Sequence, residues 1–214
     1  MALSWMSFPR PSQSEGSTSG TWDDFLSDDE IKEAFVTLND DSQMPWNLNP
    51  SLGGVKLRQH AYTFNRSRKD IEAHKGLALI DSLCDKITQR FDCEIADVFC
   101  NRFQDPNHKI DWHRDTYGTH IFVLSLGSRR NVEFRSNWLY EKEIVRPEAG
   151  DIYFMPLQLN KTHKHRVCAA DNEDDTTIPR ISLVFFATTP NYAKDYKISR
   201  MDKITGAINV FLDG

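Results

Sequence analysis

The spacing of apolar residues changes from a helical to a strand-like period partway along the chain. Two stretches carry apolar residues three and four positions apart, as on one buried helix face: Ile31, Ala34, Phe35 and Leu38 in the first, and Leu79, Ile80, Leu83, Ile87 and Phe91 in the second. Ser27 and Glu30 fit a capping box, so we predict that the first helix begins at Ser27. Between the two stretches, the β-propensity of residues 58–64 predicts a strand.

From residue 94 onward, short runs rich in Val, Ile and Phe alternate with turn residues. We predict strands at Ile95–Phe103, His120–Leu126, Asn131–Phe134, Asp151–Met155, His165–Ala169 and Ile181–Ala187. A series of such strands is typical of a β-sandwich or barrel. With the helices ahead of it, the pattern predicts an α+β fold, in which helices flank one side of a strand-built core.

The length of 214 residues allows one core of ordinary size, so we predict one domain with short extensions. We place this domain at residues 21–190, after a flexible leader over residues 1–20 that is rich in Ser, Gly and Pro, and before an extension over residues 191–214. The hydrophobic share of 39% and the charged share of 27% are those of a globular protein. No apolar run approaches the roughly 18 to 20 residues of a membrane span, so we predict none.

The cysteines indicate a reducing compartment. None of the four belongs to a C-x-x-C pair, and all lie in segments predicted to be structured: Cys84, Cys93, Cys100 and Cys168. The N-terminus also lacks the apolar run of a secretory signal. We therefore expect a cytoplasmic or nuclear protein. The oligomeric state stays open, with a monomer as the expectation.

Negative charge is concentrated at the beginning of the chain. The net charge is -5, but the first 50 residues hold nine acidic residues against Arg10 and Lys32, so the rest of the chain is slightly basic. The overall balance argues against bulk affinity for polyanions. It leaves room for a basic face on the main body of the protein.

One tripeptide suggests a metal site. His113 and Asp115 are two residues apart, and in an extended segment both side chains point to the same side and can reach one ion. A second histidine about fifty residues downstream would complete two histidines and one carboxylate, the ligand set of non-haem iron oxygenases. The same tripeptide opens the catalytic loop of protein kinases, but position 120 is His instead of Asn and no Gly-rich loop is present. The kinase interpretation therefore fails.

Short motifs stand around this tripeptide in a fixed order. They are Asn101-Arg102-Phe103, His113-Arg114-Asp115, Ser125-Leu126-Gly127, Gly150-Asp151, His165-Arg166-Val167 and Pro179–Phe186. In this order and spacing, and with Pro45-Trp46 and Arg58 upstream, residues 27–188 resemble the AlkB family of Fe(II)/2-oxoglutarate dioxygenases. The resemblance implies a double-stranded β-helix (jelly-roll) core that uses Fe(II), 2-oxoglutarate as cosubstrate, and O2.

The resemblance also implies which residues bind the metal. His113, Asp115 and His165 match the iron ligands of the family. His163 competes with His165 for the third position. We prefer His165, because its tripeptide resembles the start of the corresponding strand in the family and because its distance from Gly150-Asp151 fits better.

Arg180 matches the arginine that pairs with the distal carboxylate of 2-oxoglutarate in the family, and a guanidinium suits a carboxylate through two parallel hydrogen bonds. Asn101 and Ser182 match further cosubstrate-binding positions. Two residues depart from the pattern. Phe103 replaces a tyrosine and loses its hydroxyl, and Phe186 stands where the family has a second arginine beside the iron-bound end of the cosubstrate. These departures bear on the substrate class.

The family reaction hydroxylates a C–H bond, and on an N-methyl group the product releases formaldehyde. Our leading hypothesis is demethylation of N-alkylated bases in DNA or RNA, held single-stranded or flipped out of the stack. Candidate aromatic walls for the base are Trp46, Tyr62, Phe64, Trp112 and Tyr117, and candidate phosphate contacts are Arg58, Arg66, Arg68, Lys69, Arg129, Arg130 and Arg135. The alternatives are a hydroxylase or demethylase of a protein side chain or small molecule, and a binding module without turnover.

Overall fold

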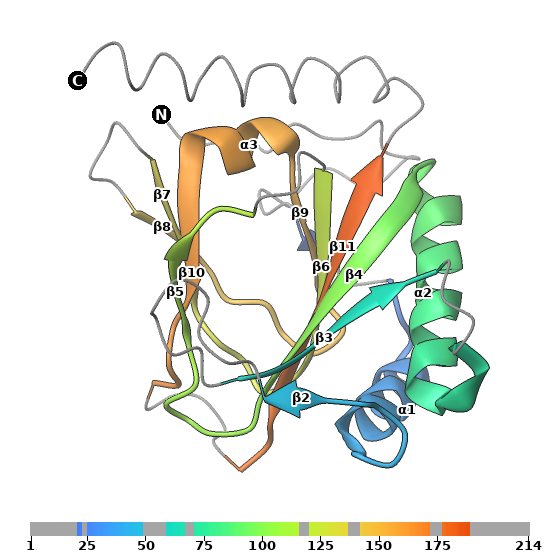
Figure 1. Cartoon of the computed structure of the whole chain (residues 1–214). Coiled ribbons are helices and arrows are strands. Elements are labelled where there is room, and N and C mark those ends of the chain that lie inside the picture. Colours follow the sequence, from blue (N-terminus) through green and yellow to red (C-terminus); the bar gives the residue numbers. More distant parts are fainter. Residues whose placement is uncertain are drawn as a thin grey trace.

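Two antiparallel sheets face each other across a shared interior (Figure 1). A computed structural model describes residues 21–22, 25–48, 59–66, 71–115, 120–136, 142–171 and 177–188. The predicted leader and C-terminal extension lie outside these ranges. The larger sheet has, in spatial order, β1 (Thr21–Trp22), β9 (Ile152–Met155), β6 (His120–Gly127), β11 (Arg180–Thr188), β4 (Glu94–Phe103), β3 (His60–Asn65) and β2 (Asn47–Leu48). The smaller has β5 (Ile110–His113), β10 (His163–Val167), β7 (Val132–Ser136) and β8 (Lys142–Val145).

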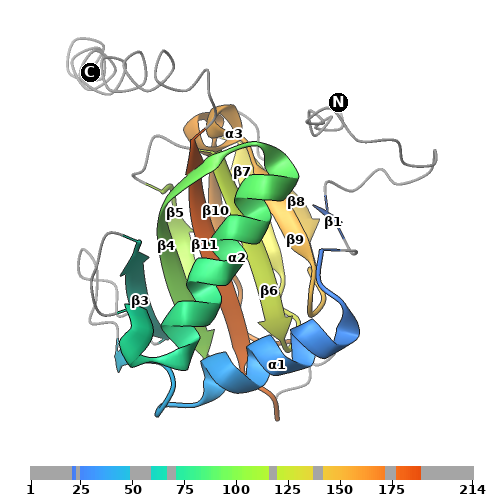
Figure 2. The ribbon, with the colours of Figure 1, turned by 90° about the vertical axis from the view of Figure 1, so that its right-hand side faces the viewer.

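Two helices cover the outer face of the larger sheet, as Figure 2 shows from that side. They are α1 (Asp28–Asn39) and α2 (Lys75–Phe91), and the short helix η1 (Ile71–Ala73) precedes α2. Their apolar faces and the outward side chains of β4, β6 and β11 form one buried cluster, which includes Leu38, Ile80, Leu124 and Phe185. Within the described ranges, no helix is long and apolar enough to cross a lipid bilayer.

A second apolar cluster fills the space between the two sheets. It joins Phe103, Val123 and Phe186 of the larger sheet to Phe134 and Val167 of the smaller one. Along the long strands of the larger sheet, one side chain faces the helices and the next faces the interior between the sheets. This arrangement confirms the predicted α+β fold with a jelly-roll core and helices on one side.

The structure contains several elements that the apolar pattern did not predict. Besides the short pieces β1, β2 and η1, they are β5, β8 and the six-residue helix α3 (Leu157–Thr162), which links β9 in the larger sheet to β10 in the smaller. In addition, β10 begins at His163, two residues before the predicted start, and β3 covers residues 60–65 where 58–64 was predicted. Gln59 is outside β3, and residue 58 is outside the described ranges.

Two glycines of the quoted motifs have structural reasons. Gly127 ends β6 with φ of +75°, and Gly150 precedes β9 with φ of +93°, in the region that side chains rarely adopt. A Cβ atom at Gly127 would collide with the carbonyl of Pro179, and one at Gly150 would collide with Ile31 of α1. Both glycines therefore let neighbouring segments approach closely where strands of the larger sheet begin or end.

Candidate active site

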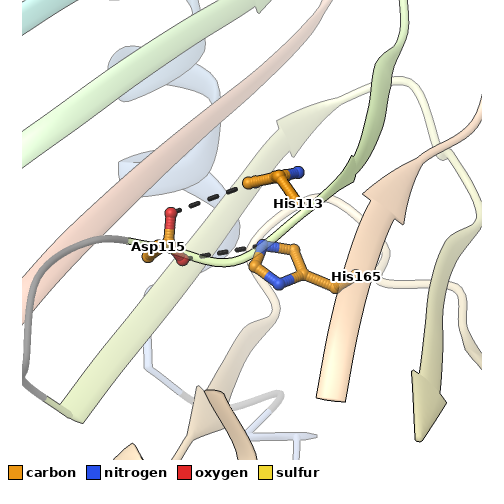
Figure 3. Close-up of side chains that lie close together, drawn as sticks. All are labelled: His113, Asp115 and His165. Carbon is orange, nitrogen blue, oxygen red and sulfur yellow. Dashed lines mark ion pairs between the residues drawn. The ribbon is translucent and has the colours of Figure 1, made fainter. Parts of the chain in front are cut away.

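Three possible metal ligands converge on the inner face of the smaller sheet. His113 ends β5, Asp115 follows after one residue, and His165 lies in the middle of β10. His165 is the direct cross-strand partner of His113, and directly opposed residues of neighbouring strands point to the same face. In Figure 3 the Asp115 carboxylate faces both imidazole rings. The chain therefore brings together the three residues that the resemblance singled out.

The spacing of the three side chains suits one metal ion. Their possible ligand atoms all lie within 4.8 Å of one another. Asp115 Oδ1 is 3.9 Å from His113 Nε2, and Asp115 Oδ2 is 3.6 Å from His165 Nε2, so neither contact is a hydrogen bond. Ligands bound at about 2.1 Å in neighbouring positions of an octahedral ion lie about 3 Å apart. A small contraction of the group would thus complete three sides of such an ion.

Burial shifts the protonation of His165 and Asp115. Burial, and the nearby His113, lower the pKa of His165 well below its usual value, which keeps the imidazole in the neutral form that binds metals. Burial raises the pKa of Asp115, and His113 opposes this effect. Asp115 Oδ2 and His165 Nδ1 are buried without a hydrogen-bond partner among the described residues. A divalent cation would supply the missing counter-charge of the carboxylate.

Hydrogen bonds fix two of the three residues in place. His113 Nδ1 lies 2.8 Å from the backbone carbonyl of Asp111. Because a carbonyl only accepts, Nδ1 carries the proton and Nε2 keeps its lone pair for a metal. Asn160 of α3 holds the backbone of Asp115 on both sides: its Oδ1 accepts from the Asp115 N–H at 3.1 Å, and its Nδ2 donates to the Asp115 carbonyl at 2.9 Å.

A row of buried polar side chains crosses the inner face of the larger sheet. Ser182 of β11 is the cross-strand partner of Asn101 in β4 and of Ser125 in β6. All three are at most 3% exposed. At the β3 end of the row, the Gln59 amide donates to Asn101 Oδ1 at 3.4 Å. The structure therefore places Asn101 and Ser182 side by side, and it adds Ser125 and Gln59, which the sequence did not identify.

Arg180 lies at the start of β11, fully buried and on the same inner face as Ser182. Its Nη2 donates to Ser125 Oγ at 3.1 Å, and its guanidinium lies over the ring of Phe103 at 5.4 Å. The Tyr153 hydroxyl of β9 also hydrogen-bonds Arg180, and burial raises the pKa of this tyrosine to about 12, so it stays protonated. Tyr153 thus supplies the Arg180 environment with the hydroxyl that Phe103 lacks.

Phe186 lies on the same inner face of β11. It is 2% exposed and packs in the apolar cluster between the sheets. Side chains therefore alternate regularly from Arg180 to Phe186, and a register shift occurs only after Phe186. Since the neighbours of Phe186 in that cluster are apolar, an arginine at this position would be buried among them.

The second candidate histidine, His163, is not part of the converging group. It begins β10 two residues before His165, and its Nδ1 lies 2.9 Å from the hydroxyl of Thr162. Burial lowers the pKa of His163. Among the described residues, the group whose ligand atoms converge contains His113, Asp115 and His165 alone.

The structure overturns most of the predicted base-binding wall. Trp46, Tyr62 and Phe64 all pack on the helix side of the larger sheet, away from the interior that holds the histidines. Trp46 also donates from its indole to the Leu38 carbonyl at 2.8 Å. The reason is that even-numbered residues of β3 face the helices, which the apolar pattern did not reveal. Tyr117 lies outside the described residues.

Several predicted phosphate contacts have other roles. Arg66 forms ion pairs with Asp81 and Asp85 of α2, both at 2.7 Å. Arg130 is buried and donates to the carbonyls of Asp105 and Pro106, so it is a structural residue. Arg129 pairs with Glu148 at 3.1 Å, and Arg135 lies on the outer face of the smaller sheet. The remaining candidates lie outside the described residues: Arg58, Arg68 and Lys69.

Similarity to known proteins extends over the segment that carries these residues. Residues 96–189 match the family model of the 2OG-Fe(II) oxygenase superfamily. Over 113 residues, the chain is 27% identical to an uncharacterised protein, R406, from Acanthamoeba polyphaga mimivirus, and the match covers 51% of this chain and 58% of the viral protein. Residues 96–189 are therefore similar to the 2OG-Fe(II) oxygenase superfamily, whose members use Fe(II), 2-oxoglutarate and O2.

Proposed function

We propose that this chain is an AlkB-like dioxygenase that removes N-alkyl groups from bases of DNA or RNA. The observation that carries the proposal is the convergence of His113, Asp115 and His165 on an interior that also contains the buried Arg180. In the reaction, one atom of O2 hydroxylates the C–H bond of an N-methyl group, and the other enters 2-oxoglutarate, which becomes succinate and CO2. The hydroxymethyl product then separates into formaldehyde and the bare nitrogen.

In this proposal the three convergent residues would hold Fe(II), which would supply the chemistry that activates O2. Two imidazoles and one carboxylate are the ligand set that would suit such an ion together with a chelating cosubstrate. His113 is held in the required tautomer by the Asp111 carbonyl. Asn160 keeps the Asp115 carboxylate in place through the backbone.

Arg180 binds the distal carboxylate of 2-oxoglutarate in this proposal. A buried guanidinium presents planar donors that match a carboxylate, and charge-assisted bonds of this kind are stronger in a water-poor interior. Tyr153 can donate its hydroxyl beside Arg180, while Asn101 and Ser182 offer further polar contacts. The apolar cluster around Phe103 and Phe186 excludes water from the same interior.

A nucleic-acid substrate is supported by the order of motifs over residues 27–188 and by the slightly basic balance beyond residue 50. For such a substrate we expect the enzyme to be in the cytoplasm or the nucleus, without a membrane partner. The Phe186 position and the acidic N-terminus keep a protein side chain or a small molecule as the second candidate substrate class.

The test is a substrate panel analysed by mass spectrometry. The full chain is incubated with Fe(II), 2-oxoglutarate, ascorbate and air, together with single-stranded DNA or RNA oligonucleotides that carry different N-methylated bases. We expect loss of a methyl group from at least one base, with equal amounts of formaldehyde and succinate. Succinate formation without demethylation of any base would favour a protein side chain or a small molecule as the substrate. Absence of succinate under all conditions would contradict the dioxygenase proposal itself.

A further inference from the structure

A row of three positive charges lies on the outer face of the smaller sheet. Lys164 of β10 is the cross-strand partner of Arg135 in β7, and Arg135 is in turn the partner of Lys142 in β8. Their neighbours His165 and Phe134 are buried toward the interior, so the three cations point outward. We call Lys164, Arg135 and Lys142 the cationic row. No described helix covers this side of the sheet, as Figure 1 shows.

Like charges directly opposite each other on neighbouring strands destabilise a sheet. Neighbouring strands are about 4.8 Å apart, so the three cations of the row occupy a span of about 10 Å. A surface chosen for stability alone would alternate charges here. The adjacent row shows such an alternation, because Arg166 of β10 faces Glu133 of β7 and the two form an ion pair at 2.8 Å.

An aromatic ring holds several of these cations in place. The Trp112 ring lies 4.7 Å from the guanidinium carbon of Arg135, 4.9 Å from that of Arg166 and 5.9 Å from Lys142 Nζ. A guanidinium stacked on an aromatic ring keeps its N–H donors free at the edge. Because its orientation is already fixed, it loses less rotamer freedom when an anion binds.

The outer face stays positive after its ion pairs are counted. Within the described part of the sheet, Glu133 lies on this face and is shared between Arg166 at 2.8 Å and Lys142 at 3.4 Å, while Asp111 of β5 is paired with Lys109 at 3.3 Å. The Arg166 guanidinium is the largest cause of the lowered pKa of Glu133, so the carboxyl stays ionised. One negative charge therefore stands against four positive ones, from Arg166 and the cationic row.

We propose that the cationic row, together with Arg166 and Trp112, binds the sugar-phosphate backbone of a single-stranded nucleic acid. The inference rests on the proposed function, because it assigns a docking surface to the same substrate class. A strand suits the surface better than an acidic globular protein, since a line of cations follows a regular line of phosphates and the Trp112 ring can stack with an exposed base.

The surface is separate from the catalytic interior. Lys164 and Arg166 flank His165 in β10, but they point to the opposite face of the strand. A substrate that uses both faces must extend beyond a single nucleotide. The surface therefore favours long strands over short ones, and it contributes to substrate binding without touching the reacting atoms.

The test compares a triple variant, Arg135→Gln, Lys142→Gln and Lys164→Gln, with the control Arg129→Gln. Arg129 is an exposed cation outside this sheet that pairs with Glu148. The probe is an unmodified, fluorescein-labelled oligothymidylate of about 20 nucleotides, longer than the usual single-strand site. Fluorescence anisotropy with the full chain gives the dissociation constant over a series of salt concentrations.

We expect the triple variant to bind the probe at least about tenfold more weakly. The slope of log Kd against log salt should fall by about 2, because each lost phosphate contact removes about 0.7 from the slope. The control should keep the slope of the wild type. Removal of three like charges should also leave the unfolding temperature unchanged or higher. If the triple variant does not fold, Arg135→Gln alone should lower the slope by about 0.7.

Equal binding by the triple variant and the control would overturn the inference, as would wild-type protein that binds poly-glutamate as tightly as the probe. The second result would assign the surface to an acidic protein partner. Succinate formation without a nucleic acid should not change in the triple variant. If the wild type demethylates no base but the triple variant still loses probe binding, the docking surface is upheld and the proposed function is contradicted. The two failures are therefore distinguishable.

Discussion

Asn160 provides the sharpest test of how the fold holds the proposed metal ligands. This residue is 5% exposed, lies in α3 and forms two hydrogen bonds with the backbone of Asp115. It touches Asp115 through the backbone only, so it is a positioning residue. We expect Asn160→Ala to release the segment that carries Asp115 and to weaken metal binding while the protein remains folded.

The size of the effect follows from the two lost bonds. Each buried hydrogen bond contributes about 0.5 to 1.5 kcal/mol, so the pair contributes about 1 to 3 kcal/mol. If the whole of this free energy is lost from the metal-bound form of the protein, the dissociation constant for Fe(II) rises about fivefold to 140-fold. Partners that hold metal ligands commonly have effects of this size.

The assay is an anaerobic titration of the apoprotein with Fe(II) in the presence of 2-oxoglutarate, followed through the visible band of the chelate. A matched control is Asn131→Ala, which removes a side-chain hydrogen bond to Asp171 next to the same sheet but away from Asp115. Thermal unfolding of both metal-free variants separates a loss of stability from a loss of affinity. We expect weaker Fe(II) binding in Asn160→Ala only.

Two results would refute this reasoning. An Fe(II) dissociation constant within twofold of the wild type would mean that Asp115 stays in place without Asn160. Equal weakening of Fe(II) binding in Asn131→Ala would mean that any loss of a hydrogen bond in this region loosens the site. In either case Asn160 would be an ordinary structural residue of α3.

Four further outcomes are expected. His165→Ala should abolish the Fe(II)-dependent band in a folded protein while His163→Ala keeps it, and the reverse pattern in the titration would contradict the ligand assignment. Arg180→Lys should raise the apparent constant for 2-oxoglutarate about ten- to hundredfold, since an ammonium cannot replace a two-pronged contact; an unchanged constant in a succinate assay would rule out that role. Tyr153→Phe should raise the same constant about threefold to tenfold by loss of one hydrogen bond, with unchanged Fe(II) binding. A hydrogen bond from Lys86 of α2 is the main cause that lowers the pKa of Glu30 to about 2, so Glu30 should stabilise the folded state above about pH 4.5 and lose this effect as pH falls toward 2. Denaturant titrations at pH 5 and pH 2.5 give the difference in the free energy of unfolding between the two pH values. Because the Glu30 side chain is half exposed, Glu30→Gln should reduce this difference by only about 1 kcal/mol.

The sequence by itself determined the elements whose causes are local. The first helix begins where the capping box predicts it, since Ser27 Oγ accepts from the Glu30 N–H at 3.4 Å and the Glu30 carboxylate accepts from the Ser27 N–H at 2.8 Å. The stripe of α2 and the long strands β4, β6 and β11 also follow from spacing and composition. In each case neighbours in the chain supply the signal, so no knowledge of distant partners is needed.

Elements stabilised by distant partners could not be predicted in this way. β5 and β8 are four residues each and form the two edges of the smaller sheet. Their residues are mostly half-buried or exposed, so they carry little apolar pattern. Their strand conformation depends on pairing with β10 and β7. Short strands of this kind acquire their hydrogen bonds only when the sheet assembles.

For the candidate site, too, local sequence identified some residues and strand pairing was needed for others. His113 and Asp115 share one motif, and Arg180 is marked by its place in another, so local sequence identified them. Alternation alone could not separate His163 from His165, because both point toward the same face of β10. Only the pairing of β10 with β5 places His165 directly opposite His113.

Only the tertiary structure identified the residues that support the candidate site. Asn160 lies 45 positions from Asp115 along the chain, and Ser125 lies 55 positions from Arg180. The cationic row likewise exists only because three strands come into register. A sequence determines which chemical groups a chain carries and which local turns of helix or strand they favour. Which groups meet is decided by long-range strand pairing, because contact between distant residues requires the whole sheet to form.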